Sequence, residues 1–323
     1  MHRSATEVVV HDIAPCVNTI RDDVLLGLSR CPKELPSQYL YDARGAKLFE
    51  QICDTREYYL TRTELGILND NMAEISECVG FGAFVIEPGS GSGLKTRNLL
   101  KGLDNPSVYI PVDVAKKQLA SFATSISREF PAIEVRPVCA DFTDHFDVPA
   151  EDDDAHMRLC FFPGSTIGNF KPAAALDVLN RMAEMCGCHG CVLIGVDMKK
   201  DRKTLEAAYD DEQGVSREFA LNYLVRLNRE LDAGIQIEQF AYEAPYNESL
   251  GRIEMALVSL CDQEISIAGT PVRFKKNERI STEYSCKFTH EEFAALAEKA
   301  GLNVHQVWTD SERLFSIQYL EPK

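Results

Sequence analysis

From residue 84 onward, short apolar runs alternate with stretches of helical periodicity, and this alternation constrains the fold more than any other feature. The runs occupy 84–87, 108–112, 133–138, 159–162 and 192–196, and helical patterns such as 95–100 and 174–185 separate them. Buried strands that alternate with helices are typical of βαβ units. The sequence therefore predicts an α/β fold built on a parallel, doubly wound sheet.

The flanking segments have a different rhythm. Helical patterns are expected at 20–28, 48–52 and 64–75, and mostly helix at 201–231. Period-two strands follow through 235–288, notably 253–257 and 280–285, and the tail adds a helix at 291–300, ended by Gly301, and strands at 304–308 and 314–320. We expect one domain from 63–199 and 289–323, and a second, α+β lobe from 1–62 and 200–288.

Composition narrows the set of partners. Fifty Asp and Glu against 34 Lys and Arg give a net charge of -16, which opposes a surface that neutralises phosphates, so no nucleic-acid partner is expected. No apolar run approaches the roughly 20 residues that cross a bilayer, which predicts a cytoplasmic protein without a membrane partner. The protein is also expected to be a monomer. Eleven cysteines, an odd number, are typical of reduced thiols in a core.

Two segments suggest metal binding, and neither has the spacing that a metal site needs. The acidic run at 151–154 lacks the glycine and alternating ligands of a calcium loop and is predicted to be a solvated connection. A second cluster consists of Cys186, Cys188, His189 and Cys191. Its spacing is too tight for paired zinc ligands and no second pair follows, which favours a turn between helix and strand. No metal is predicted.

A glycine-rich turn follows the first apolar run. The run ends at Glu87, and Gly89, Gly91 and Gly93 come next in a G-x-G-x-G spacing. Glycines allow tight backbone geometry and close approach of a ligand. Because Leu94 stands where a dinucleotide fingerprint has its third glycine, a dinucleotide is disfavoured. The acidic Glu87 suits a cationic or amine-bearing ligand.

Acidic residues also follow the next two strands. Asp113 lies 20 residues beyond Gly93, where a carboxylate can accept hydrogen bonds from ribose hydroxyls. Asp141 follows the third strand and can accept from an adenine amino group, while the ring of Phe142 packs on the base. Each acid taken alone could merely cap the following helix. Their combination resembles class I S-adenosylmethionine-dependent methyltransferases, whose sheet is Rossmann-like.

Further motifs resemble a narrower family. They occupy 41–45 with 48–52, 57–64, 164–169, 208–211, 252–255 and 282–288. Together they are similar to the histidine Nα-methyltransferases of the ergothioneine pathway, and the similarity runs from about Pro32 to the C-terminus. The resemblance implies S-adenosyl-L-methionine as the cofactor and free L-histidine as the small-molecule substrate, methylated successively to hercynine. It also implies a Rossmann-like domain with a separate substrate lobe.

The resemblance also assigns roles by position. Cofactor contacts fall on Gly89, Lys95, Asp113, Asp141 and Phe142, beside Glu87 and Gly91 of the same turn. Substrate contacts fall on Tyr58 and Asn169 for the α-amine, Tyr41 and Tyr209 for the carboxylate, and Glu283, Ser285 and Met255 around the imidazole. Tyr58 and Asn169 are the expected catalytic residues: the first relays the amine proton, and the second orients the nitrogen.

Other readings of these residues stay open at this stage. The three tyrosines and Met255 could belong to the core, Glu283 could be an exposed strand acid, and Asn169 could be a turn residue. Tyr284 departs from the smaller aliphatic residue typical of the family, although strand alternation should point it to the opposite face. If Tyr284 enters the pocket, tryptophan or tyrosine becomes a competing substrate. A non-catalytic protein that binds the cofactor is the alternative from another functional class.

Overall fold

The computed structural model describes residues 8–13, 19–91, 93–149 and 157–323, which form two compact units. The first unit comprises the described residues of 1–17, 62–198 and 288–323, and the second those of 18–61 and 199–287. Within the described residues, none of the helices combines the length and the apolar character that crossing a membrane would require. The acidic run expected at 151–154 lies outside the described residues.

A large sheet forms the centre of the first unit, with strand order β1-β6-β4-β3-β7-β8-β16-β15 and β5 paired with β4. The strands are β1 (His11–Asp12), β3 (Phe84–Pro88), β4 (Val108–Asp113), β5 (Glu134–Val135), β6 (Val138–Cys139), β7 (Arg158–Phe162), β8 (Cys191–Asp197), β15 (Leu302–Thr309) and β16 (Phe315–Pro322). All pairs are parallel except β16 with β8 and β15. The strand order reverses direction between β3 and β7, which confirms the expected doubly wound α/β fold.

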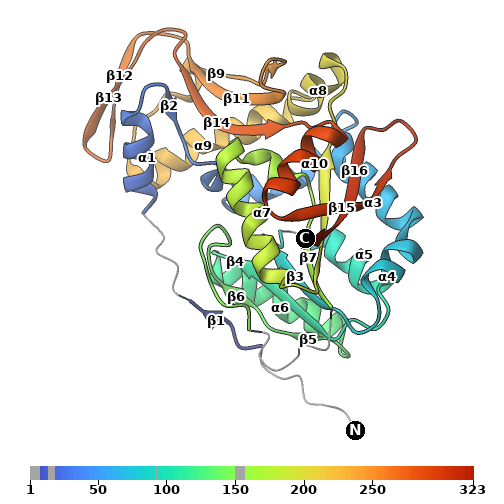
Figure 1. The fold of residues 1–323 in the computed structure, drawn as a ribbon. Helices are drawn as coiled ribbons and strands as arrows, with labels where there is room; N and C mark the ends of the chain where they lie inside the picture. Colours follow the sequence, from blue (N-terminus) through green and yellow to red (C-terminus); the bar gives the residue numbers. More distant parts are fainter. Residues whose placement is uncertain (1–7, 14–18, 92, 150–156) are drawn as a thin grey trace. The chain divides into compact units, whose positions relative to one another are not determined.

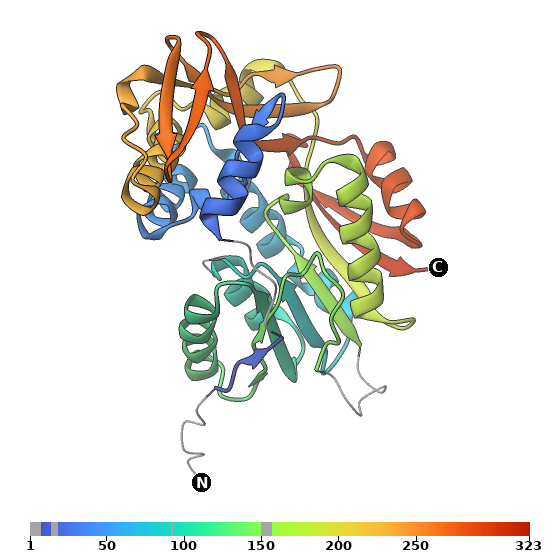
Figure 2. The same ribbon diagram turned by 90° about the vertical axis from the view of Figure 1, so that its left-hand side faces the viewer.

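Helices cover both faces of this sheet, and Figure 2 shows α6 on one side with α7 and α10 on the other. The helices are α3 (Tyr59–Asp70), α4 (Met72–Val79), α5 (Leu94–Gly102), α6 (Lys116–Glu129), α7 (Pro172–Cys186) and α10 (His290–Lys299), with a 3-10 turn η2 (Thr166–Asn169). The core against α7 and α10 includes Ile86, Phe162, Leu179 and Phe293. Because both faces are covered, all five residues of β3 are buried, which is why the central strands read as continuous apolar runs.

The second unit is α+β and is built on a smaller sheet of order β10-β11-β14-β2, with β9 paired to β11 (Figure 1). Its strands are β2 (Lys33–Glu34), β9 (Phe240–Glu243), β10 (Tyr246–Asn247), β11 (Arg252–Ser259) and β14 (Arg279–Cys286), and β12 (Gln263–Ile267) pairs with β13 (Thr270–Phe274) as a separate ribbon. Its helices are α1 (Ile20–Ser29), α2 (Ala43–Asp54), α8 (Arg202–Tyr209) and α9 (Val215–Leu231), with 3-10 turns η1 (Ser37–Leu40) and η3 (Ile237–Gln239).

Polar side chains and a proline divide three segments that were expected to be continuous. The strand expected at 133–138 is split into β5 and β6, because Pro137 has no N–H for the ladder. The helix expected at 64–75 is interrupted at Asn71, whose side-chain amide donates to the Ile67 carbonyl at 2.8 Å. The helix expected at 201–231 is interrupted at 210–214, where the Asp211 carboxylate accepts from the Ser216 N–H at 2.7 Å and caps α9.

The N-terminal boundary also differs from the expectation that 1–62 would join the second lobe. Strand β1 pairs in parallel with β6, with His11 opposite Val138, so these residues belong to the large sheet of the first unit. A two-residue strand carries no periodicity that a sequence pattern can reveal, and only its long-range pairing identifies it.

Candidate functional site

The glycine-rich turn of the first unit lies at the carboxyl end of β3, at the point where the strand order reverses. Gly89, Gly91 and Gly93 have φ values of 71°, 50° and 71°. A Cβ on Gly93 would lie 2.1 Å from the ring of Phe122, whereas a Cβ on Gly91 would meet nothing closer than 3.9 Å. Gly93 is therefore needed for packing between α5 and α6. The first two glycines leave room for the close approach of a ligand.

The carboxylate of Glu87 is engaged with protein donors. Glu87 is fully buried, and it accepts hydrogen bonds from the Thr96 hydroxyl at 2.7 Å and from the Tyr109 hydroxyl at 2.5 Å. Burial raises the pKa of Glu87 to about 7, and these two hydrogen bonds oppose the rise. The Glu87 side chain thus connects α5 to the sheet. This structural role is additional to the cofactor contact expected from the sequence.

Asp113 and Asp141 follow the neighbouring strands β4 and β6. Asp113 accepts from the Ala115 N–H at 2.8 Å, and burial raises the pKa of its carboxyl. Asp141 accepts from the N–H and the hydroxyl of Thr143 at 2.9 and 2.7 Å. Each acid therefore fixes its own turn, and neither is the N-cap of a following helix: the N-cap of α6 is Ala115, and the next helical element described after Asp141 is η2. These bonds use Oδ1 of each carboxylate.

Phe142 lies beside the glycine-rich turn. Its ring stands 3.6 Å from the position that a Cβ on Gly89 would take, and it packs edge-on against Phe162 with ring centroids 5.7 Å apart. An aromatic face, two carboxylates and a glycine cradle thus gather at one edge of the sheet. This donor and acceptor set fits a nucleoside joined to an amino-acid moiety.

Lys95 is held by a carboxylate that the sequence did not single out. Glu64 is 1% exposed, forms an ion pair with Lys95 and accepts from the Gly164 N–H at 2.8 Å. A Cβ on Gly195 of β8 would lie 2.1 Å from Oε1 of Glu64, so no residue larger than glycine fits at this position. Glu64 lies within the segment 57–64 that resembles the family. In the sequence, the only hint of its role would have been that Glu64 occurs together with Gly164 and Gly195.

Asn169 is the expected substrate residue that belongs to the first unit. It ends η2, which follows β7, and its side chain is exposed. Before that turn, Ser165 adopts φ 55° and its hydroxyl accepts from the Asp197 N–H at 2.9 Å, which fixes the backbone between β7 and η2. Asn169 is therefore placed at the carboxyl edge of the same sheet.

An aromatic cluster of the second unit brings together the three tyrosines expected to bind substrate. The ring of Tyr41 packs edge-on against Phe49 and Phe219, with centroids 5.5 and 5.3 Å apart. Phe49 contacts Tyr58 at 6.1 Å, and Tyr58 contacts Tyr209 at 6.0 Å. Tyr41, which follows η1, and Tyr58, which precedes α3, are thus linked through Phe49 of α2, Phe219 of α9 and Tyr209 of α8 by a continuous series of ring contacts.

Tyr209 and Ser285 also share a buried lysine. Their oxygens lie 2.7 Å apart, and the ammonium of Lys287 donates to Tyr209 at 2.7 Å and to Ser285 at 2.8 Å. Lys287 is 2% exposed. These three side chains form a closed triangle, which we call the Lys287 triangle.

Glu283 lies beside this triangle on β14. It stands opposite Met255 of β11, next to a bulge at Thr282, which turns strand residues locally. Burial raises the pKa of Glu283 to about 7, and the charge of Lys287 opposes the rise. Burial also raises the pKa values of Tyr58 and Tyr242, and the charge of Glu283 adds to both. The expected substrate residues of this unit therefore converge around one carboxylate.

Tyr284 does not join that cluster. The guanidinium of Arg252 lies 4.1 Å from its ring centroid, and Arg252 is itself paired with Glu254 at 2.7 Å. Tyr284 is opposite Glu254 in the β11–β14 ladder, so these residues share the face away from Glu283. The expectation from strand alternation is confirmed.

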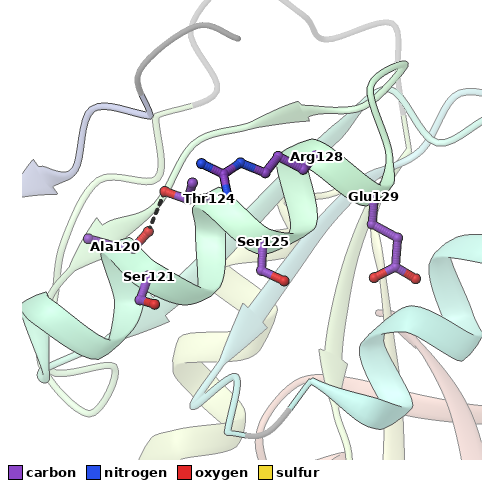
Figure 3. Close-up of a pocket in the computed structure, with 6 residues that line it drawn as sticks. All are labelled: Ala120, Ser121, Thr124, Ser125, Arg128 and Glu129. Atoms are coloured by element: carbon purple, nitrogen blue, oxygen red, sulfur yellow. Dashed lines mark hydrogen bonds between the residues drawn. The ribbon is translucent and has the colours of Figure 1, made fainter.

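The hollow along α6 offers no comparable chemistry. This shallow hollow has a volume of about 700 Å³ and contains none of the expected site residues (Figure 3). It is lined by Ala120, Ser121, Thr124, Ser125, Arg128 and Glu129. Across the described ranges, no three His, Cys, Asp or Glu side chains gather closely enough to hold a metal ion.

Comparison with known proteins identifies the family. Residues 20–322 match the family described as histidine-specific, S-adenosylmethionine-dependent methyltransferases. The chain belongs to this family. It is an enzyme of the methyltransferase class, and S-adenosyl-L-methionine is its methyl donor, as expected.

Relatives in this family match the chain over nearly its whole length. The histidine N-alpha-methyltransferase of Mycolicibacterium smegmatis is 39% identical over 90% of this chain and 91% of its own. That of Mycobacterium tuberculosis is 37% identical over 92% and 93%. Ergothioneine biosynthesis protein 1 of Neurospora crassa is 30% identical over 86% of this chain but only 32% of its own length.

The sequence reasoning missed side chains that act behind the expected ones. Glu64 holds Lys95, Lys287 holds Tyr209 and Ser285, and Phe49 and Phe219 support Tyr41. The sequence segments that resemble the family contain Glu64, Phe49 and Lys287. No spacing or periodicity in those segments distinguishes these three residues from their neighbours. Their importance is visible only in the contacts.

Asp113 gives a first test of the cofactor end. Replacing it with asparagine removes one charged acceptor, and we expect S-adenosylmethionine affinity to fall about tenfold. Isothermal titration calorimetry measures the affinity, and Asp104→Asn, at an exposed position of the same unit, serves as the control. Equal affinities of the two variants would exclude Asp113 from cofactor binding.

Proposed function

We propose that this protein methylates the α-amine of free L-histidine with S-adenosylmethionine, successively, to the trimethylated betaine hercynine, as a step of ergothioneine biosynthesis. The observation that carries the proposal is the convergence of Glu283, Ser285, Tyr209 and Tyr58 in the second unit. The names of the relatives that cover the chain support the same substrate. We also propose that the protein is cytoplasmic and monomeric. Light scattering coupled to gel filtration would test the monomeric state.

Specificity for histidine is proposed to come from the pair Glu283 and Ser285. A carboxylate accepts an imidazole N–H, and a hydroxyl can donate to the other ring nitrogen. Glu283 is surrounded by tyrosines, so an apolar substrate would leave its carboxylate without that partner. Met255, opposite Glu283 on the neighbouring strand, would pack on the ring. Tyr41 and Tyr209 are proposed to bind the substrate carboxylate with their hydroxyls.

The chemistry demands alignment more than activation. When bound, S-adenosylmethionine would supply the methyl group of its sulfonium: the amine lone pair would bond to the methyl carbon as the C–S bond breaks, and S-adenosylhomocysteine would leave. The ammonium form of the substrate must first lose a proton. Because burial raises the pKa of Tyr58 well above its ordinary value, this side chain stays a neutral hydroxyl, suited to accept an N–H hydrogen bond and to relay the proton. The proposed role of Asn169 is to orient the nitrogen through its side-chain oxygen.

Mass spectrometry tests the proposal directly. Purified protein is incubated with S-adenosylmethionine and an equimolar mixture of free amino acids. Mass gains of one to three methyl groups on histidine alone are expected. Methylation of tryptophan or tyrosine would overturn the substrate but keep the reaction, and cofactor binding without any product would overturn catalysis on free amino acids.

The ionisation of Glu283 predicts how histidine binding depends on pH. Its pKa of about 7 lies above the ordinary value, so the accepting carboxylate becomes more populated as pH rises through 7. The dissociation constant of histidine should therefore fall between pH 6 and 8, as measured by calorimetry with S-adenosylhomocysteine present. Glu283→Gln should remove the part of this dependence that exceeds the titration of histidine itself. An unchanged profile in the variant would contradict the role.

A further inference from the structure

Lys287 is buried in a place where a charged side chain is costly. It follows β14 directly and is 2% exposed, and its ammonium lies 4.5 Å from the ring centroid of Tyr209. Lysines are almost never fully buried unless they are paired, because removing the charge from water is unfavourable. The two hydrogen bonds to Tyr209 and Ser285 offset part of this cost.

The triangle restricts how the two hydroxyls can orient. An ammonium only donates, so both hydroxyl oxygens accept from Lys287. The same two oxygens are 2.7 Å apart, and one of them must donate to the other. One hydroxyl hydrogen is thus used inside the triangle, and the other hydroxyl directs its hydrogen to a third group. Either hydroxyl can be the donor of the pair. Without the ammonium, from which both oxygens accept, the two hydroxyls could also turn away from each other.

The charge of Lys287 also reaches Glu283. Among the described residues, the titratable groups that interact electrostatically with this carboxylate include the hydroxyls of Tyr41, Tyr58 and Tyr242 and the ammonium of Lys287. Asp210 and Asp211 act in turn on Tyr242. The positive charge therefore acts on two parts of the proposed substrate site: the hydroxyl pair, of which Tyr209 is proposed to meet the substrate carboxylate and Ser285 the imidazole, and the carboxylate of Glu283.

We propose that Lys287 is a positioning residue for substrate specificity, which fixes the hydroxyls of Tyr209 and Ser285 and supplies the positive charge that faces Glu283. The site then selects a substrate side chain that brings an acceptor for a hydroxyl hydrogen together with an N–H for the carboxylate. This inference rests on the proposed function, and deepens it. According to this inference, Lys287 positions the hydroxyls of Tyr209 and Ser285 and influences the carboxylate of Glu283, the three groups that would contact the substrate.

The first test needs no substrate. Glutamate carboxyl carbons are labelled with ¹³C, and Glu283 is titrated by NMR in the free protein, its signal being identified by its loss in Glu283→Gln. The variant Lys287→Gln keeps an amide group that can donate two hydrogen bonds but removes the charge, so the titration midpoint of Glu283 should rise by about one pH unit. The control Lys33→Gln removes a lysine that pairs with Glu278 in the same sheet, and it should leave the midpoint unchanged. An unmoved midpoint in Lys287→Gln would overturn the inference.

The second test uses histidine. Lys287→Gln should weaken histidine binding at pH 7 about tenfold and raise KM more than it lowers kcat, while S-adenosylhomocysteine affinity stays within about threefold. Adding Lys287→Gln to Glu283→Gln should produce no further shift of the pH profile. A parallel loss of kcat, cofactor affinity and thermal stability would indicate a merely structural role and overturn the proposal.

Two safeguards keep the result decisive. If Lys287→Gln does not fold, Lys287→Met removes the charge with an unbranched side chain of similar length, and a rise of the Glu283 midpoint of about one pH unit supports the inference, whereas a midpoint close to that of the wild type contradicts it. Failure of the wild-type protein to bind histidine would overturn the proposed function, and with it the specificity role. The NMR titration would still show by itself whether Lys287 governs Glu283.

Discussion

Replacing Glu283 with alanine should reduce kcat/KM for histidine about 100-fold, because an imidazole N–H left unpaired in a buried site costs about 3 kcal/mol. The carboxylate lies among the buried hydroxyls of Tyr58 and Tyr242, where little water is available to replace it. Steady-state kinetics with histidine, phenylalanine and tryptophan measure the effect. The loss on histidine should exceed any loss on the aromatic amino acids.

Glu254→Ala is the matched control for that variant. Glu254 is a glutamate of the neighbouring strand, but its carboxylate pairs with Arg252 on the opposite face. Its removal should change kcat/KM for histidine less than about threefold, as is usual for an ion pair near the surface. If Glu283→Ala lowered kcat/KM equally for histidine and for aromatic amino acids, Glu283 would not be the residue that recognises the imidazole.

Gly93→Ala should destabilise the protein by about 2–4 kcal/mol and weaken S-adenosylmethionine binding at least about tenfold. The backbone at Gly93 has φ 71°, which costs any L side chain energy, and the added Cβ would lie 2.1 Å from the ring of Phe122. Either the ring or the turn must move. A moved turn would displace Gly89 and Gly91 from the end of β3. Thermal unfolding and calorimetric titration of the cofactor measure the two effects.

Gly214→Ala separates backbone strain from the clash. Gly214 has φ 75° and ψ 19°, close to the 71° and 14° of Gly93, and it also precedes a helix, but a Cβ there meets nothing within 4 Å. It should cost about 1 kcal/mol and leave cofactor affinity unchanged. Adding Phe122→Ala to Gly93→Ala should restore part of the affinity by opening space. A Gly93→Ala variant that binds the cofactor as tightly as Gly214→Ala would show that the turn tolerates the side chain.

The fold was predictable to the extent that burial leaves a local trace. Strands covered on both faces are apolar at most positions, with charged residues only near their ends, so β3, β4, β7 and β8 were recognisable from their runs. The breaks at Pro137 and Asn71 were not anticipated, although proline and asparagine are the residues that interrupt ladders and helices. Strand β1 was out of reach, because its two residues are defined only by pairing with β6.

The sequence by itself determined the fold class, the family and the residue types expected to meet cofactor and substrate, because short motifs and strand periodicity are local properties. Only the tertiary structure showed that Glu64 holds Lys95, that Lys287 closes a triangle with Tyr209 and Ser285, and that Tyr284 lies under Arg252. These facts depend on distances between residues far apart in the chain. The pKa of Glu283 likewise follows from burial among tyrosines and from one nearby ammonium, neither of which a sequence pattern contains.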